Sequence, residues 1–156
     1  CHDGTVLDVF FLQDISNQAI EDASELARIG KTLEQSLVGA IELEKLLQDR
    51  WRQTPLRVRQ MPVSSRVLLS NKISKTHTVI EVNGRDFPGL LHKITQSLAD
   101  LGLQIQTATV STYGERVVDV FYVKDIFGLQ IQNGVRQQTI RNRLLEIFID
   151  TDEAVV

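Results

Sequence analysis

The sequence predicts an α+β fold in which an antiparallel sheet carries its helices on one face. Three observations lead to this prediction: a β-branched run that passes directly into a helix, a strand hairpin around a glycine turn, and an amphipathic helix after that hairpin. In chain order these elements read β-α-β-β-α. With one further strand, this series is the ferredoxin-like plan, βαββαβ.

The first strand and helix occupy the stretch up to residue 101. Residues 76–83 are rich in valine and isoleucine, which favours a strand. Asp86 and Pro88 suit the first turn of a helix, because an aspartate can cap free amides there and proline has no N–H to lose. The apolar residues that follow lie on one helical face: Leu90, Leu91, Ile94, Leu98 and Leu101. Gly102 then ends the helix.

A hairpin and a last helix follow. Residues 103–112 are rich in isoleucine, threonine and valine, the chain turns at Gly114, and residues 117–124 return as a second strand. Residues 135–149 are predicted to form a helix with apolar side chains on one side: Ile140, Leu144, Leu145 and Phe148.

An internal repeat links the two ends of the chain. Residues 6–15 match residues 117–126 at a constant offset of 111, and Asp, Val, Phe, Asp and Ile recur identically. Each copy reads as a strand that is entered through a glycine turn and followed by a helical segment. A chance likeness of two unrelated strands is the alternative. Because the first copy begins at the hairpin, we expect its own first strand, first helix and most of its second strand to lie upstream of Cys1.

A long helix and a connector are predicted between the copies. Residues 22–49 carry an apolar stripe, with Asp22 and Glu25 spaced as a capping pair. Beyond them, arginines are interleaved with tryptophan and proline, which indicates a solvated linker, with a nucleic-acid patch as the alternative. We interpret residues 66–71 as the closing strand of the first unit and residues 72–75 as a link into the second.

Length and composition fit two small modules. Residues 1–71 read as the C-terminal part of a first module with its arginine-rich connector, and residues 72–156 as a second module. The 156 residues are 42% hydrophobic and 24% charged, which are ordinary globular values. A net charge of -3 gives no attraction for nucleic acid or a membrane, and no apolar run approaches the roughly 20 residues of a membrane span. The single cysteine, Cys1, and the lack of a leader indicate a cytoplasmic fragment without disulfides.

The loop between the first strand and the first helix is the candidate ligand site. It delivers the chain onto a helix N-terminus, where free amides and the positive end of the dipole can bind an α-carboxylate. Gly89 lets the backbone approach closely, and Asn83 and Asp86 offer oxygens to an α-ammonium group. The candidate ligand-binding residues are Asn83, Gly84, Asp86, Phe87, Pro88, Gly89, Leu90 and Leu91. The alternative is that Asp86 only caps the helix and the glycines only turn the chain.

The sequence contains no catalytic or metal-binding constellation. Asp8 and Asp119 recur in the middle of apolar strands, and alternation places Asp119 on the side of Val117, Phe121 and Val123. The recurrence indicates a structural hydrogen bond or a contact between modules, since catalysis would need a second, converging carboxylate. The three histidines lack ligand spacing, and the glycine fingerprints of nucleotide sites are missing. We therefore expect no catalytic residue, no metal and no cofactor in this chain.

Three motifs taken in order resemble the ACT family: residues 78–82, the loop Asp86-x-Pro88-Gly89-Leu90-Leu91, and the run from Thr112 to Asp125. Over nearly its whole length the chain resembles the C-terminal tandem ACT region of bacterial bifunctional uridylyltransferase/uridylyl-removing enzymes, of the alphaproteobacterial type. The resemblance implies that glutamine or another small amino acid binds here. It also implies control over the catalytic domains of the same polypeptide, which add UMP to the PII nitrogen signalling protein and remove it. Phe87 stands where the family usually carries arginine, which favours the alternative of an ACT scaffold without a small-molecule ligand.

Overall fold

The computed structural model describes residues 9–14, 16, 18–53 and 63–153, without the side chains of Trp51 and of residues 150–153. The chain divides into two compact units, residues 1–43 and residues 44–156. The second unit holds the sheet and most of the core.

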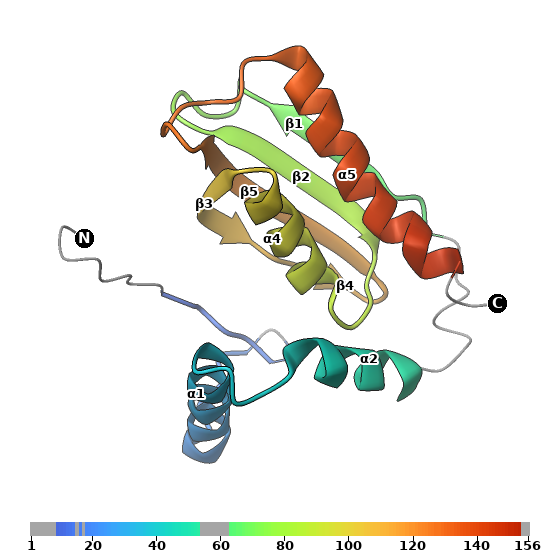
Figure 1. Cartoon of the computed structure of the whole chain (residues 1–156). Coiled ribbons are helices and arrows are strands. Elements are labelled where there is room, and N and C mark those ends of the chain that lie inside the picture. The colour runs from blue at the N-terminus through green and yellow to red at the C-terminus, as the bar shows by residue number, and fades with distance from the viewer. Residues whose placement is uncertain (1–8, 15, 17, 54–62, 154–156) are drawn as a thin grey trace. The chain divides into compact units, whose positions relative to one another are not determined.

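The second unit is built on a five-stranded antiparallel sheet with the order β1-β2-β5-β3, in which the short β4 also pairs with β5. Its strands are β1 (Arg66–Ser70), β2 (Thr78–Arg85), β3 (Leu103–Thr109), β4 (Thr112–Tyr113) and β5 (Arg116–Asp125). Helices α4 (Leu90–Asp100) and α5 (Gly134–Glu153) both cover one face of this sheet (Figure 1). The expected α+β, ferredoxin-like arrangement of strands and helices is therefore confirmed.

Strand β1 occupies a place that we did not predict. We expected residues 66–71 to close the first unit, but β1 pairs with β2 in the second unit, with Val67 opposite Val82. In the ferredoxin-like plan this edge belongs to the strand that follows the last helix. Here β1, which precedes β2 in the chain, fills it. A hairpin makes this possible, because residues 71–77 are enough to reverse the chain between antiparallel neighbours.

A small polar network fixes that hairpin to the rest of the unit. The Thr78 hydroxyl donates to the Asn71 side-chain oxygen at 2.7 Å and accepts the Ile131 N–H at 2.9 Å. The Asn71 amide in turn donates to the Ile131 carbonyl at 3.0 Å. Thr78 is fully buried, so these bonds satisfy a hydroxyl that would otherwise be costly in the core.

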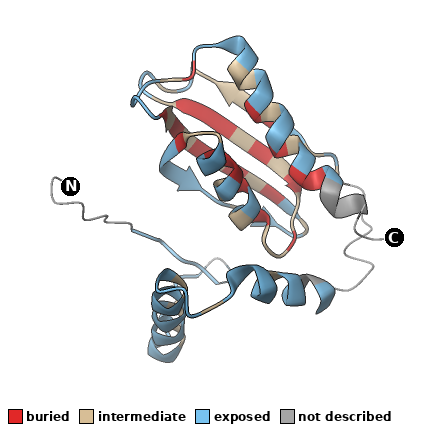
Figure 2. Cartoon of the chain, in the orientation of Figure 1, coloured by how far each residue is buried: buried red, intermediate tan, exposed pale blue. Residues whose placement is uncertain are grey.

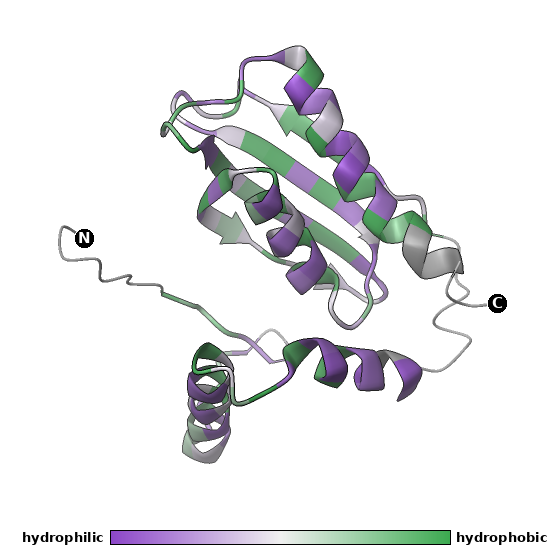
Figure 3. Cartoon of the chain, viewed as in Figure 1, coloured by the Kyte–Doolittle hydropathy of each residue, from purple (hydrophilic) through white to green (hydrophobic). Residues whose placement is uncertain are grey.

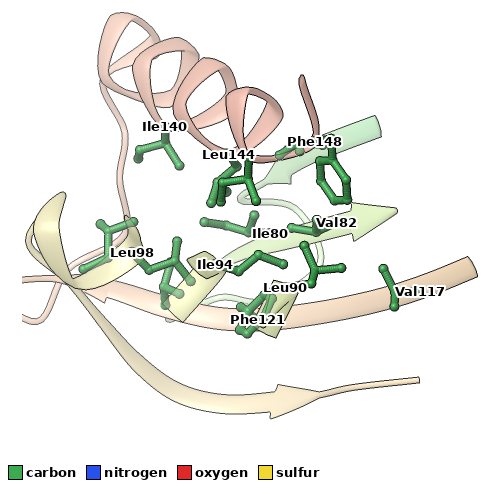
Figure 4. Packing of buried hydrophobic residues seen from close by; sticks show 14 of the residues in the cluster. Ile80, Val82, Leu90, Ile94, Leu98, Val117, Phe121, Ile140, Leu144 and Phe148 are labelled. Atoms are coloured by element: carbon green, nitrogen blue, oxygen red, sulfur yellow. The ribbon is translucent and has the colours of Figure 1, made fainter. Parts of the chain in front are cut away.

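The core lies between the sheet and the two helices. Figure 2 shows buried residues alternating along β2 and β5, and Figure 3 shows the hydropathy of the same strands alternating in step. The close view places Ile80, Val82 and Phe121 of the sheet opposite side chains of both helices (Figure 4). These helical side chains are all less than 7% exposed: Leu90, Ile94 and Leu98 of α4, and Ile140, Leu144 and Phe148 of α5. The helical faces predicted from periodicity are confirmed, apart from Leu91, whose side chain is exposed.

The long helix predicted over residues 22–49 is wrong. The structure has two helices in its place, α1 (Ala23–Leu37) and α2 (Leu43–Gln53). Helix α1 begins at Asp22, whose carboxylate accepts the Ser24 N–H at 2.8 Å. It ends where Gly39 adopts a left-handed backbone with φ 70° and donates to the Ser36 carbonyl. Because the apolar stripe continues across this stop, periodicity alone joined the two helices.

The internal repeat is visible in the loops that follow each copy. Asp14 accepts the N–H groups of Ser16 and Gln18 at 2.7 and 3.0 Å. The residues 111 positions later repeat this turn: Asp125 accepts the N–H groups of Phe127 and Leu129, both at 2.9 Å. The two units therefore share local geometry as well as sequence.

Candidate functional site

The N-terminus of α4 has free backbone donors. Gly89 precedes the helix in a left-handed conformation with φ 90°, no side chain caps the helix, and its first turn contains no acidic residue. The Leu90 N–H donates to the Phe87 carbonyl at 3.0 Å. The N–H groups of Leu91 and His92 find no acceptor in the described part of the chain. These donors and the positive end of the helix dipole together favour an anion.

A cavity of about 470 Å³ opens beside this helix end. Such a volume falls in the range of small-molecule sites, which is about 300–1,000 Å³. Part of the predicted ligand loop lines it, namely Phe87, Pro88 and Gly89. The other walls come from one side of α4, from α5 near Ile147 and from α2 near Leu47. A Cβ added to Gly89 would lie 3.4 Å from Leu47, so α2 covers the cavity closely at that point.

Three of the remaining predicted residues have structural contacts instead of a place in the cavity wall. A Cβ on Gly84 would overlap the Phe148 ring, so glycine is needed there for close packing. Leu90 is 2% exposed and belongs to the core. The Asn83 amide donates to Glu81 at 2.7 Å on the sheet face that the helices leave uncovered.

Asp86 and Asp119 form a pair of partly or fully buried carboxyl groups. Asp119 is 1% exposed on the core face of β5, as alternation predicted, and accepts the Ser111 N–H at 3.2 Å. Burial raises the pKa of Asp119 to about 6, and the nearby charge of Asp86 adds to this rise. Burial also raises the pKa of Asp86, against a hydrogen bond from the Phe87 N–H that lowers it. Asp119 thus makes a structural hydrogen bond, which is one of the two alternatives that the sequence left open.

Phe87 joins the loop to α5. It is 6% exposed and meets Phe148 edge to face, with ring centroids 6.4 Å apart. The Lys93 amino group lies 5.7 Å from the Phe87 ring centroid, in a cation–π contact. An aromatic residue at this position therefore anchors the loop and also positions a cation at the cavity.

Comparison with known proteins identifies the fold family. Residues 73–146 match the family described as the ACR family N-terminal ACT domain. Over these residues the chain is similar to an ACT domain. The resemblance stated from the motifs is thereby confirmed, and with it the ACT form of the α+β fold. No solved structure matches the chain at a significant level.

Several relatives of this chain share one name. A "bifunctional uridylyltransferase/uridylyl-removing enzyme" of Rhodospirillum rubrum is 48% identical over 142 residues, covering 91% of this chain. Proteins of the same name from Gluconobacter oxydans and Azospirillum brasilense are 44% identical over 92% of the chain and 45% identical over 94% of it. The chain spans only 15–16% of the length of these relatives. It is thus similar to one part of much longer proteins.

The described part of the chain contains no cluster of metal-binding side chains. No group of three or more histidine, cysteine, aspartate or glutamate side chains that could hold a metal ion occurs among the described residues. His77 instead contacts the Thr76 hydroxyl at 2.9 Å and the edge of Tyr122. Cys1 and His2 lie outside the described residues. None of the described helices is long and apolar enough to span a bilayer.

Several residues of the ACT cavity were missed by the sequence reasoning. The polar cavity residues of α4 lie on one side of that helix: His92, Lys93, Gln96, Ser97 and Asp100. Their spacing of three and four residues was present in the sequence, next to the apolar stripe. No sequence signal placed α2 and its Glu44 beside them, because that contact depends on tertiary packing.

Proposed function

We propose that this chain is a regulatory amino-acid-sensing region, with glutamine as the ligand. In this proposal it controls the uridylylation and deuridylylation of the PII signalling protein by catalytic domains of the same polypeptide. The chain performs neither reaction itself and needs no metal or cofactor, and the polypeptide acts in the cytoplasm. The uncapped first turn of α4, open to a cavity of about 470 Å³, is the observation that carries the proposal. The name shared by the relatives supports the choice of enzyme.

The chemistry of binding follows from the loop. An α-carboxylate placed at the free N–H groups of Leu91 and His92 gains hydrogen bonds and the field of the helix dipole. Gly89 has no Cβ, so nothing from the loop itself blocks this approach. Control requires only that the ligand binds one arrangement of the enzyme more tightly than another. A coupling free energy of about 1–3 kcal/mol is typical of such control.

Calorimetric titration of the chain with glutamine and with glutamate is the direct test. We expect heat of binding with glutamine and weaker binding with glutamate. In the full-length enzyme, glutamine should shift activity from UMP addition toward UMP removal. Absence of binding by any amino acid would overturn the proposal.

A matched pair of glycine variants links the site to control. Gly89→Asp places a negative charge at the α4 N-terminus and should abolish the glutamine response. Gly114→Asp is the control, because Gly114 also has a positive φ, 63°, but a Cβ there would meet nothing within 4 Å. A full response in Gly89→Asp would contradict a ligand at this loop.

A scaffold without a small-molecule ligand is the second candidate. The observation that favours it is the burial of Phe87 against Phe148, which makes part of the loop a packing element. In that case the ACT units would still associate with each other or with PII while no amino acid binds. Retained association together with an abolished glutamine response in Gly89→Asp would decide against the scaffold.

A further inference from the structure

We propose that the cavity binds a zwitterionic α-amino acid between two opposite charges, Lys93 of α4 and Glu44 of α2. The ligand's carboxylate contacts Lys93 and the free amides of α4, and its ammonium group contacts Glu44. This inference rests on the proposed function, because it assumes that an amino acid binds in this cavity. In this inference, two side chains outside the ligand loop, Lys93 and Glu44, recognise the charged groups of the ligand.

Lys93 carries a positive charge near a helix N-terminus, where a negative charge is favoured. It lies at the positive end of the α4 dipole, where a cation is disfavoured unless a negative charge is near. The first turn supplies no acidic residue. Within the described residues, the Phe87 ring is the partner found for the Lys93 amino group. A bound carboxylate would therefore relieve an unfavourable local field.

The other acidic and basic side chains of the cavity already have partners. Arg143 pairs with Glu146 at 3.1 Å. Asp100 accepts a hydrogen bond from the Gln96 amide at 2.9 Å. Among the lysine, arginine, aspartate and glutamate residues of the lining, this leaves Lys93 and Glu44 for a ligand.

Glu44 supplies the opposite charge from a different wall. It lies in the first turn of α2 and lines the cavity one turn before Leu47. Among the described residues it forms no salt bridge, with Lys93 or with any other cation. The two charges thus face one cavity without neutralising each other, as a ligand that carries both a carboxylate and an ammonium group requires.

This arrangement explains the residue at position 87. The family resemblance led us to expect an arginine there, whereas this chain has Phe87. The Phe87 ring packs on Phe148 and contacts Lys93, so the positive charge comes from α4 instead of the loop. Because Glu44 belongs to α2, ligand binding would also hold α2 against the cavity. Residues 38–42 connect α2 to α1 along the chain.

The test uses calorimetry of the chain with glutamine and two analogues that each lack one charge. Glutamine α-amide lacks the carboxylate, and N-acetylglutamine lacks the ammonium group. We expect each missing charge to weaken binding to the unaltered chain about tenfold, the effect of one charge-assisted contact. Lys93→Met should weaken glutamine binding several-fold and reduce the discrimination against the α-amide, while the free amides of α4 keep part of it. Glu44→Gln should instead lose discrimination against N-acetylglutamine only.

Three further variants serve as controls. Lys93→Arg keeps the charge and should restore discrimination against the amide. Lys72→Met and Glu34→Gln change exposed residues outside the cavity lining and should behave as the unaltered chain. Glutamine binding with unchanged discrimination in Lys93→Met and Glu44→Gln would overturn this inference and leave the proposed function standing. No binding to the unaltered chain would overturn both.

Discussion

The two copies of the repeat place the same helical face in opposite environments. Ile140, Leu144 and Phe148 of α5 are 1%, 0% and 6% exposed. Their counterparts 111 positions earlier lie on α1, where Leu33 is 49% and Leu37 is 78% exposed. The local signals are nevertheless alike, since an aspartate or asparagine begins both helices, Asp22 accepting the Ser24 N–H and Asn133 the Arg136 N–H. Amphipathicity is thus encoded in each helix, whereas burial requires a sheet to pack against.

The segments preceding these helices differ in the same way. Phe121 of β5 is fully buried, whereas Phe10, its counterpart, is 68% exposed. Among the described residues, the first unit has one isolated bridge, Gln13 to Ala19, in place of a sheet. The contrast therefore isolates what the sheet contributes to an otherwise equivalent segment.

The largest difference in free energy of unfolding between the two copies is expected when one leucine in each of α5 and α1 is truncated to alanine. Leu144→Ala leaves a cavity in a packed core and should lower the free energy of unfolding by about 2–5 kcal/mol. Leu33→Ala removes a half-exposed side chain and should cost less than about 1 kcal/mol. Urea unfolding followed by circular dichroism measures both changes. Equal effects would show that α1 is buried as fully as α5.

A pH titration of stability separates the two repeated aspartates. The pKa of Asp119 is about 6 in the folded state, above its ordinary value of 3.8. Because its pKa is raised in the folded state, Asp119 makes a contribution to stability that is fully present below pH 3.8. This contribution is lost as the pH rises through 6. The loss amounts to about 3 kcal/mol, because each tenfold change in an acid dissociation constant corresponds to about 1.36 kcal/mol. Asp119→Asn should remove this pH dependence in urea unfolding between pH 4 and 7.

Asp8→Asn is the matched control for that titration. Asp8 lies outside the described residues, but its neighbours Val9 and Phe10 are 71% and 68% exposed. We therefore expect the stability curve of Asp8→Asn to keep its pH dependence. A curve flattened by Asp8→Asn as much as by Asp119→Asn would mean that the two copies share one environment.

Replacing glycine by alanine should have opposite effects on stability at two positions. Gly84→Ala forces a Cβ into the Phe148 ring and should destabilise the second unit by about 1–3 kcal/mol. Gly30→Ala in α1 meets nothing within 4 Å, so it should stabilise that helix by about 0.5–1 kcal/mol. Unfolding midpoints report the first change, and helical circular dichroism reports the second. A neutral Gly84→Ala would show that the contact with α5 is loose.

The smallest difference in free energy of unfolding is expected at the two turns that follow Asp14 and Asp125. Asp125 is 8% exposed, accepts two backbone N–H groups, and lies 4.0 Å from Arg136. Asp125→Ala leaves buried donors unpaired and should cost about 1–3 kcal/mol. Asp14→Ala breaks the same two bonds at an exposed loop, where water replaces them, and should cost less than about 1 kcal/mol. Hydrogen exchange of the four turn amides measures each loss separately.

The sequence predicted those parts of the fold that depend on local periodicity. The alternation in residues 117–124 and the spacing of Ile94 and Leu98 indicated buried faces correctly, because each pattern lies within one element. The stop at Gly39 was missed, since a stripe of apolar residues continues beyond it. The partner of residues 66–70 was assigned to the wrong unit, because strand pairing depends on chain reversal and not on the composition of the strand.

The candidate site was predictable only in part. The motif around Pro88 and Gly89 indicated a helix N-terminus, and both residues line the cavity. Lys93 and Glu44 are ordinary surface residues by pattern, and they are far apart in the sequence. Their convergence follows from packing of α2 and α4 around one space, which a single sequence does not encode in any short motif. Whether these residues and the loop bind a ligand stays a prediction.

The strand order has a practical consequence for isolating this domain. The family match begins at residue 73 and ends at residue 146. A fragment cut at those limits would lose β1 and with it the covering of the β2 edge, leaving a row of unpaired backbone N–H and C=O groups. It would also lose Phe148, against which Gly84 packs. Such a fragment should aggregate through edge-to-edge strand pairing, whereas one that starts before residue 66 and continues past residue 150 keeps both features.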